Sequence, residues 1–418
     1  MLNKNNEREL AYVVTVDAVT PIEGYDRVEL AHVGGWTIVV GKGEFHAGDP
    51  AIYFEIDSKL PEVEPFTNME FLAKKKYKIK TQKMCKSISQ GLLMSAANFG
   101  WTINSTRFDF KEVSYIQDDL GNQYFPDDDS SRFLTKKLGV TYAVEEDNKR
   151  KASSVDKYKK MAQRNGKLFS HQPFRWLMKR EWGKKILFLF FGKKRDKKSG
   201  WPVWVSKTDE ERVENMPYIL QNKSEWIATE KIDGTSTTFT LKRGSFLHPE
   251  EFYICSRNVV FDKPDKKCFY ETNVYTEIAE KYFIYDRMKK LLNDKAFEDC
   301  DWITIQGETY GAGIQKRDYH APSGEHYFMA FNFITSKDGR WNSVKMKELL
   351  EKRIGIPCVP ILNDHYILPD TIDELRAYVD SEKSVLDGDI KEGIVFRSQD
   401  GVCSFKCVSP NYLLKYHS

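Results

Sequence analysis

The chain has 418 residues, of which 41% are hydrophobic, 13% aromatic and 30% charged, and its formal net charge is only +3. This length allows two or three domains, because single domains usually contain on the order of 100 to 200 residues. The composition excludes a wholly disordered chain. Because the net charge is close to zero, nucleic-acid binding can be argued only from where the charges lie along the chain.

The cysteines and the apolar runs indicate the compartment. The seven cysteines are scattered, with no Cys-x-x-Cys pair and no secretory leader ahead of them, which predicts reduced thiols. The longest dense apolar run, residues 186–191, is far shorter than the ~20 residues of a membrane-spanning helix. We therefore expect a cytoplasmic protein with no membrane partner.

Short strand-like runs separated by Gly and Pro turn residues fill the N-terminal segment. The runs are residues 12–16, 28–30, 36–40 and 51–54. This spacing predicts antiparallel strands that curl into a small barrel such as an OB-fold. We predict an OB-like domain with an acidic extension over residues 1–147.

Two tracts are strongly basic. Residues 148–200 are predicted to be a basic linker or insertion, in which positions 149–198 carry eighteen Lys and Arg against three acidic residues, interleaved with aromatics. Residues 74–86 are also rich in lysine. Basic and aromatic residues together suit phosphate contact and base stacking. A solvated linker or a solvated edge strand has the same composition, so both interpretations stay open.

Residues 201–418 predict an α+β domain of normal size. Residues 201–205 are expected to form a strand and residues 207–213 a helix that Thr208 would cap. Further helices are expected over 279–292 and 344–353.

A lysine stands at the end of a predicted strand, in the sequence Glu230-Lys231-Ile232-Asp233-Gly234. Alone this match is weak, because a surface hairpin produces it by chance. Further segments follow it in order, and most are short hydrophobic strands that carry one or two polar residues. They are residues 256–258, 303–308, 328–333, 391–397 and 404–406. Their order fits one pocket.

This ordered set resembles the covalent nucleotidyltransferase superfamily of DNA ligases, RNA ligases and mRNA capping enzymes. The resemblance covers residues 201–415 and implies an ATP-grasp-like ligase domain of antiparallel sheets and helices. In that superfamily the lysine of the first motif becomes covalently bound to a nucleoside monophosphate, which by position is Lys231. The implied catalytic residues are Lys231, Asp233, Glu308, Glu392 and Lys406. The implied nucleotide-binding residues are Glu230, Gly234, Arg257, Phe331 and Lys207.

Three of these roles can be stated more closely. Arg257 would contact the ribose or the RNA end. Phe331 would stack on the base, although Phe328 or Phe333 could do so instead, because an aromatic in such a run is more often part of the core. Lys415 is a candidate helper of Lys406 in phosphate contact.

The chemistry of the side chains supports the resemblance. A free lysine has a pKa of about 10.4, so Lys231 needs a lower pKa to attack phosphorus at neutral pH. A metal ion and Lys406 could supply that lowering. The carboxylates of Asp233, Glu308 and Glu392 suit Mg²⁺ or Mn²⁺, which prefer oxygen ligands. The metal and Lys406 would offset the charge on the α-phosphate of ATP as pyrophosphate leaves.

The order of the domains distinguishes the members of the superfamily. DNA ligases and capping enzymes carry their OB module after the last motif, whereas here only residues 407–418 follow it. The OB-like segment stands in front, which is similar to RNA ligases with an N-terminal OB module, sometimes called family five. Residues 79–92 and 207–212 also resemble that family.

We therefore expect a monomeric ATP-dependent RNA ligase that acts on nicked or broken RNA ends, in duplex or single strands, in RNA repair. Lys231 would attack ATP to give lysyl-AMP and pyrophosphate. AMP would pass to an RNA 5′-phosphate, and a 3′-hydroxyl would then attack that activated end and release AMP. The alternatives are a DNA ligase, an mRNA guanylyltransferase and a non-catalytic nucleic-acid-binding protein.

Overall fold

The structure is a computed structural model of the chain. Its described residues are 8–108, 111–126, 134–143, 171–180, 182–183, 186–187, 201–246, 248–257, 259–261 and 273–416. Most of the predicted basic linker lies outside them, and only the residues around helix α6 (Gln172–Met178) are described there. The predicted boundary after residue 147 falls in a gap, and the one after residue 200 falls at the edge of a gap. Both boundaries therefore stay predictions.

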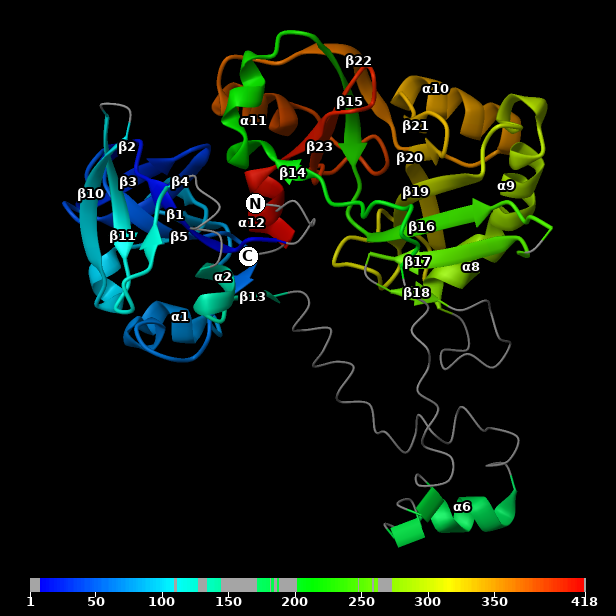
Figure 1. Cartoon of the computed structure of the whole chain (residues 1–418), viewed down its shortest axis with the longest axis horizontal. Helices are drawn as coiled ribbons and strands as arrows, with labels where there is room; N and C mark the ends of the chain where they lie inside the picture. Colours follow the sequence, from blue (N-terminus) through cyan, green and yellow to red (C-terminus); the bar gives the residue numbers. More distant parts are fainter. Residues whose placement is uncertain are drawn as a thin grey trace.

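The N-terminal part is an antiparallel β module around one hydrophobic core (Figure 1). One sheet has the order β1-β5-β9 and another the order β2-β3-β4. These strands are β1 (Ala11–Thr15), β2 (Ala18–Ile22), β3 (Tyr25–Val33), β4 (Trp36–Gly41), β5 (Pro50–Phe54) and β9 (Leu92–Met94). Every second residue of β4 is buried, as in a strand with one face on a core. Each strand-like run predicted from the sequence overlaps one of these strands.

Shorter elements complete this module. They are β6 (Ser58–Lys59), η1 (Phe66–Asn68), α1 (Glu70–Lys74), β7 (Gln82–Met84), β8 (Ser87–Ser89) and η2 (Ala96–Phe99). The acidic extension adds β10 (Thr102–Phe108), β11 (Lys111–Gln117), β12 (Gln123–Tyr124), α2 (Leu134–Lys137) and β13 (Thr141–Tyr142). Trp101, Ile116 and Leu134 are buried in the same core as the first strands, so the extension belongs to this module.

Two mainly antiparallel sheets form the C-terminal part (Figure 1). The first has the order β14-β24-β23-β15-β22, in which β14 and β24 are parallel, and the second has the order β18-β17-β16-β19-β20-β21. The strands are β14 (Glu211–Arg212), β15 (Glu225–Lys231), β16 (Thr235–Lys242), β17 (Glu251–Ser256), β18 (Val260–Phe261), β19 (Trp302–Gly311), β20 (His326–Thr335), β21 (Gly339–Arg340), β22 (Ile361–Ile367), β23 (Gly393–Ser398) and β24 (Ser404–Val408). The residues between β15 and β16 therefore cross from the first sheet to the second.

Helices and helical turns flank these sheets. They are η4 (Val213–Asn215), η5 (Pro217–Gln221), α8 (Val274–Lys281), α9 (Ile284–Leu292), η6 (Lys295–Phe297), α10 (Ser343–Lys347), the π-helical turn η7 (Glu348–Arg353), α11 (Ile372–Ser381) and α12 (Pro410–Tyr416). The helix predicted over 279–292 is interrupted at Phe283, whose φ of 48° lies in the left-handed region. The helix predicted over 344–353 is confirmed, as α10 followed by η7.

Two elements predicted near residue 205 are wrong. Residues 201–205 form a turn instead of a strand, and the segment 207–213 contains the strand β14 instead of a helix. Asp209 pairs with Arg8, which lies in the N-terminal module, and β14 pairs with β24. These long-range contacts outweigh the helix preference of the local sequence.

The two parts of the chain pack closely against each other. The Nε1 atom of Trp36 donates a hydrogen bond to Oδ1 of Asn215 at 2.8 Å. A Cβ atom at Gly35 would lie 2.6 Å from the Cα atom of Glu214, so this approach needs a glycine. Helix α12 lies between the two parts in Figure 1, and its Leu413 belongs to the core of the N-terminal module.

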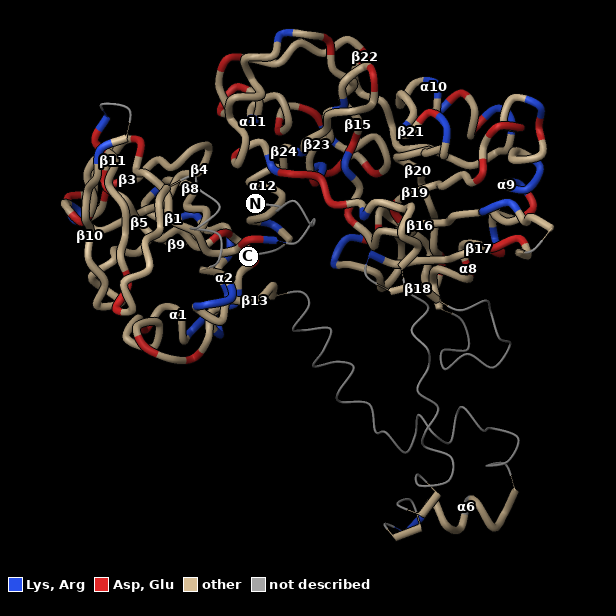
Figure 2. The backbone as a smooth tube through the Cα atoms, in the orientation of Figure 1, with Lys and Arg blue, Asp and Glu red and all other residues tan. Residues whose placement is uncertain are grey.

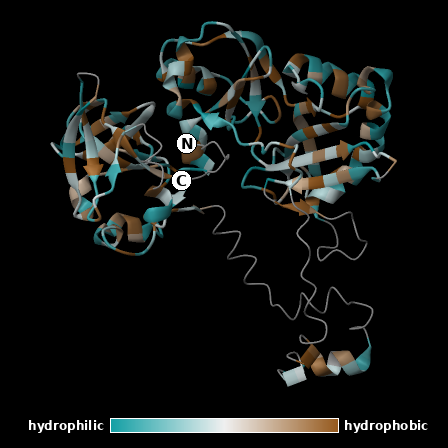
Figure 3. Cartoon of the chain, in the orientation of Figure 1, coloured by the Kyte–Doolittle hydropathy of each residue, from teal (hydrophilic) through white to brown (hydrophobic). Residues whose placement is uncertain are grey.

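Figure 3 shows hydrophobic residues concentrated in the strands of both parts, as expected for sheets that bury at least one face. Among the described residues, no helix combines the length and the apolar character needed to cross a bilayer.

Candidate active site

Lys231 is the last residue of β15 and points to the carboxylate that precedes β23. The register pairs Lys231 with Gly393, which places it beside Glu392. The Nζ atom of Lys231 lies 2.7 Å from Oε1 of Glu392. Both side chains are largely buried, so this is a partly desolvated ion pair at a strand end.

The neighbouring carboxylates control the pKa of Lys231 in this structure. Burial lowers its pKa, but Glu392, Glu308 and Asp233 outweigh burial and hold the pKa above its usual value. The lowering expected from a metal ion and Lys406 therefore stays a prediction. The carboxylates that were predicted to bind a metal here stabilise the ammonium form of the lysine.

Glu308 enters from the second sheet. It pairs with Ser236 in the register of β16 and β19. A Cβ atom at Gly234 would lie 2.3 Å from the carbonyl oxygen of Thr309, so the glycine allows the loop after Lys231 to lie against β19. Burial raises the pKa of Glu308 to about 8, and Glu392 and Asp233 add to the rise while Lys231 opposes it. These mutual effects show that the carboxylates face the same space as Lys231.

Asp233 is held by two tyrosines. The hydroxyl of Tyr412 on α12 donates a hydrogen bond of 2.5 Å to Oδ2 of Asp233, and the backbone N–H of Asp233 donates to the hydroxyl of Tyr319 at 2.7 Å. Within the described ranges, no three acidic, His or Cys side chains converge closely enough to hold a metal ion. Asp233, Glu308 and Glu392 thus form no joint metal cluster in this structure, and their role as metal ligands stays a prediction.

Lys406 lies on β24, and Asp209 links it to two arginines. Its Nζ atom is 3.5 Å from Oδ1 of Asp209, which also pairs with Arg257 and, through two hydrogen bonds of 3.2 Å, with Arg8. Lys406, Arg8 and Arg257 hold the pKa of Asp209 far below its usual value, although burial acts in the opposite direction. The pKa of Lys406 is lowered to about 8, mainly by burial, with Arg8 and Lys231 contributing and Asp209 opposing the shift. We call these four residues, Arg8, Asp209, Arg257 and Lys406, the Asp209 cluster.

Sequence reasoning missed several of these residues. Asp209 was assigned to a helix, and Arg8, Tyr319 and Tyr412 were given no role. Asp209 lies only two residues after Lys207, inside the segment that resembles RNA ligases, and this was the available signal. Arg8 and Tyr412 lie outside every motif, and only the folded chain brings them to the site.

An apolar cluster begins at the residue after Lys231. Ile232, Tyr319 and Val359 are buried in it, and Phe331 packs against it. The ring of Phe331 lies 5.9 Å from the guanidinium of the buried Arg397. This cluster gives the site a hydrophobic wall.

The other two phenylalanines considered for base stacking lie in the core. Phe328 and Phe333 are completely buried in the hydrophobic cluster of the second sheet. Phe331 is partly exposed on the other side of β20. Of the three, Phe331 is the one that faces the site, so its stacking role stays the prediction.

The other side chains predicted to contact the nucleotide or its phosphates have other partners, or are exposed, in the structure. Both carboxylate oxygens of Glu230 accept hydrogen bonds, from the hydroxyl of Ser384 and the backbone N–H of Val385, so this side chain holds a loop and does not line an open pocket. Lys207 is exposed. Lys415, the possible helper of Lys406, pairs instead with Asp389, 2.6 Å away at the surface.

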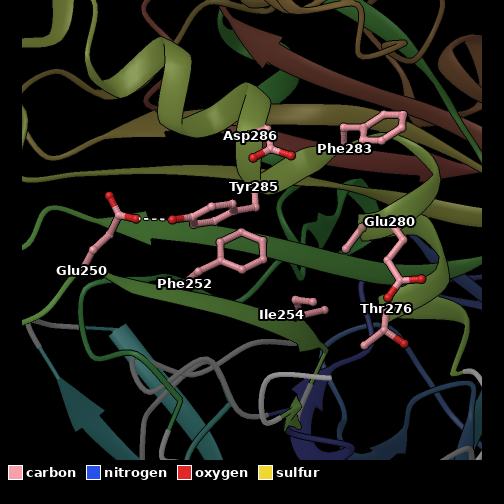
Figure 4. Close-up of a pocket in the computed structure, with 9 residues that line it drawn as sticks. Glu250, Phe252, Ile254, Thr276, Glu280, Phe283, Tyr285 and Asp286 are labelled. Atoms are coloured by element: carbon pink, nitrogen blue, oxygen red, sulfur yellow. Dashed lines mark hydrogen bonds between the residues drawn. The ribbon is translucent and has the colours of Figure 1, made fainter. Parts of the chain in front are cut away.

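A cavity of about 570 Å³ lies elsewhere on the second sheet (Figure 4). It is bordered by β17, α8 and α9, and its floor includes Phe252 and Ile254. The hydroxyl of Tyr285 donates a hydrogen bond to Glu250 at its rim. None of the predicted site residues lines it.

Comparisons with known proteins agree with this fold. Residues 224–417 match the RNA ligase family, and residues 10–96 match an OB-fold domain. A glutamate-to-alanine variant of Naegleria gruberi RNA ligase with AMP and manganese is 25% identical, with a TM-score of 0.66 over 98% of this chain and 99% of that chain. The same ligase with pyrophosphate is 24% identical, with a TM-score of 0.66 over 97% and 98% of the two chains. Comparison with curated protein sequences gives no match.

The fold and the site are thus those of a nucleotidyltransferase domain that follows an OB module. The chain is an RNA ligase with an N-terminal OB-fold domain. This finding decides between the alternatives raised by the sequence, and it favours an RNA ligase over a DNA ligase, an mRNA guanylyltransferase and a non-catalytic binding protein.

Proposed function

We propose that Lys231 is the nucleophile that carries AMP, and that the enzyme joins 5′-phosphate and 3′-hydroxyl ends of RNA. The observation that carries the proposal is the position of Lys231. It ends a strand of the RNA ligase domain, 2.7 Å from Glu392 and beside Glu308.

ATP and a divalent cation are the cofactors of this RNA ligase. A structure of a Naegleria gruberi RNA ligase variant with ATP and manganese matches 98% of this chain. The side chains of Glu308 and Glu392 fit a cation, because they are oxygen donors close enough to affect each other's charge, and a bound cation would favour the ionised form of Glu308. Asp233 would also bind the cation if its hydrogen bond to Tyr412 were broken. When bound, the cation supplies positive charge that neutralises the phosphates.

In the first step, the Nζ atom of Lys231 forms a bond with the α-phosphorus of ATP. The bond from that phosphorus to the bridging oxygen breaks, and pyrophosphate leaves with the electron pair. Lys231 must first lose a proton, and Oε1 of Glu392 lies within hydrogen-bonding distance to accept it. Lys406 and Arg257 supply positive charge for the phosphate. Phe331 stacks on the adenine.

The 5′-phosphate of an RNA then attacks the phosphorus of lysyl-AMP and displaces the Nζ atom of Lys231, which gives RNA-adenylate. The 3′-hydroxyl of a second end attacks the activated 5′-phosphate, which forms the phosphodiester bond and releases AMP. The enzyme acts as a monomer in the cytoplasm and repairs breaks in RNA, in duplex or in single strands. The six described cysteines are all free thiols, which fits a reducing compartment. The packing of the OB module on the ligase domain within one chain fits a monomer.

The test is adduct formation with α-labelled ATP and a divalent cation. The wild-type chain should acquire a label that survives denaturation in detergent, and Lys231→Ala should acquire none. Lys242→Ala is a matched control, because Lys242 ends the next strand, β16, and has no proposed role. An unlabelled wild-type chain would contradict the proposal.

Competition and substrate choice refine the result. Unlabelled ATP should suppress the adduct, whereas GTP and NAD⁺ should not. Nicked RNA should be sealed, with nicked DNA and hybrid duplexes as comparisons. Sealing of DNA in preference to RNA would contradict the assigned substrate.

A further inference from the structure

A second cavity, with a volume of about 560 Å³, lies beside the N-terminal module. Six of its lining residues are lysines between positions 74 and 83, and Thr81 and Leu414 also line it. We call it the lysine cavity. Figure 2 shows basic residues in this region, between α1 and β13.

Both parts of the chain contribute to the lysine cavity. The lysines belong to the segment from α1 to β7, whereas Leu414 lies on α12. Lys316, from the loop after β19, is near enough to repel the charge of Lys80. Tyr412, two residues before Leu414, binds the Asp233 carboxylate. The cavity therefore adjoins the helix that holds the loop of Lys231.

The positive charge of the cavity is only partly balanced. No carboxylate is among the described residues that line it. Burial lowers the pKa of Lys80, and Lys316 and Lys78 lower it further, against the opposing effect of Asp57. Burial also lowers the pKa of Lys75. A bound anion would stabilise the charged form of both side chains.

Two further features indicate that the lysine cavity is a preformed anion-binding site. The hydroxyl of Thr81 is buried and has no hydrogen-bond partner among the described residues, which leaves a donor that a phosphate oxygen would satisfy. Lys76 and Tyr77 have positive φ angles of 55° and 58°. Such strain in residues other than glycine persists only where the surrounding structure fixes the backbone.

We propose that the lysine cavity binds the phosphodiester backbone of the RNA strand whose end is joined at Lys231. The inference rests on the proposed function and adds a location for the substrate. Lysine contacts to phosphates position a nucleic acid without reading its sequence. No aromatic side chain is among the described residues of the cavity wall, so a nucleobase has no ring to stack on. A backbone phosphate therefore fits better than a whole nucleotide.

The test is direct binding of a labelled RNA oligonucleotide by fluorescence anisotropy over a range of KCl concentrations. Lys75→Gln/Lys80→Gln removes two charges from the cavity. Lys42→Gln/Lys111→Gln removes two exposed charges elsewhere on the same module and is the matched control. The slope of log K against log salt should become shallower by about 1.4 in the cavity variant, because each lost phosphate contact of a single strand contributes about 0.7. Two unrelated RNA sequences should lose affinity equally.

A variant that keeps both positive charges distinguishes loss of charge from misfolding. Lys75→Arg/Lys80→Arg should restore both the affinity and the slope. The proposal is overturned if the cavity variant binds RNA as the wild type does, if the control loses as much, or if the arginine variant fails as badly as the glutamine variant.

The adduct assay separates the remaining outcomes. A cavity variant that keeps RNA binding but needs more ATP to form the adduct would assign the cavity to the triphosphate and overturn the proposal. A wild-type chain that binds RNA through the cavity but forms no adduct would contradict the proposed function alone.

Discussion

The ammonium group of Lys231 lies 2.7 Å from Oε1 of Glu392, and this pair joins the end of β15 to the residue before β23. The contact stabilises the protonated lysine, which cannot attack phosphorus. Lys231, the proposed nucleophile, would therefore have to lose a proton before it attacks. A change in the partners of Glu392 must accompany the release of the lysine.

The first prediction concerns the reactivity of Lys231. Glu392→Gln removes the largest of the charge effects that raise the pKa of Lys231, so the pKa should fall and the uncharged fraction at a given pH should rise. The measurement is the rate of acetylation of Lys231 against pH, followed by peptide mass spectrometry. The midpoint should move to lower pH.

Glu325→Gln is the control for this experiment. Glu325 pairs with Lys281 at 2.9 Å on the surface of the second sheet, so its loss should leave the midpoint of Lys231 unchanged. An identical midpoint for Lys231 in the wild type and in Glu392→Gln would show that the ion pair does not control the nucleophile.

The sequence predicted the fold better than it predicted the electrostatics of the site. Strand periodicity and turn residues identified the OB module, because these signals are local. The order of the motifs predicted one pocket for Lys231, Glu308 and Glu392; in the structure Lys231 lies 2.7 Å from Glu392, and Glu308 is close enough for the three side chains to affect one another's pKa. Their individual roles stay predictions.

What the sequence could not predict depends on contacts between distant residues. Asp209 and Lys406 are separated by 197 positions, and Tyr412 and Asp233 by 179. No periodicity encodes such pairs. The same contacts explain the wrong helix over residues 207–213, because local propensity is only a weak preference that tertiary contacts override.

The second prediction concerns the alkaline limit of sealing. Lys406 has a pKa of about 8, so it is charged below that pH and loses its charge as the pH rises through it. Sealing of pre-adenylated RNA, which does not use Lys231 as a nucleophile, should therefore decline above a pH of about 8. An arginine keeps its charge at higher pH. Lys406→Arg should therefore remove this decline from the pH profile of the sealing rate, with each profile normalised to its own maximum.

Lys415→Arg is the control for the alkaline limit, because Lys415 pairs with Asp389 at the surface. Its profile should match that of the wild type. A decline that persists in Lys406→Arg would assign the alkaline limit to another group.

The third prediction concerns the hydroxyl of Tyr412. Tyr412→Phe keeps the ring and removes the 2.5 Å hydrogen bond to Asp233. A hydrogen bond to a charged group contributes about 1.5–3 kcal/mol, so the free energy of unfolding should fall by an amount in this range. Adduct formation should also slow, because the loop after Lys231 loses an anchor. Urea unfolding and the adduct rate measure the two effects.

Tyr416→Phe is the matched control on the same helix. The hydroxyl of Tyr416 donates to Asp389 at 2.5 Å, and this bond lies outside the site of Lys231. The variant should leave the adduct rate unchanged. Equal slowing in both variants would mean that α12 acts through its general stability and not through Asp233.

The last prediction concerns the Asp209 cluster. Asp209→Asn leaves Arg8, Arg257 and Lys406 without their shared counter-charge, so the free energy of unfolding should fall by roughly 3 kcal/mol or more. Asp209 opposes the lowering of the Lys406 pKa, so its loss should move the alkaline limit of sealing to a pH below that of the wild type. Asp118→Asn is the matched control, because it breaks the buried pair of Asp118 with Lys137 inside the OB module. It should also lower stability but keep the wild-type pH profile. A shift of the alkaline limit in both variants would show that it follows stability, whereas a shift in Asp209→Asn alone would identify Asp209 as the residue that keeps Lys406 charged.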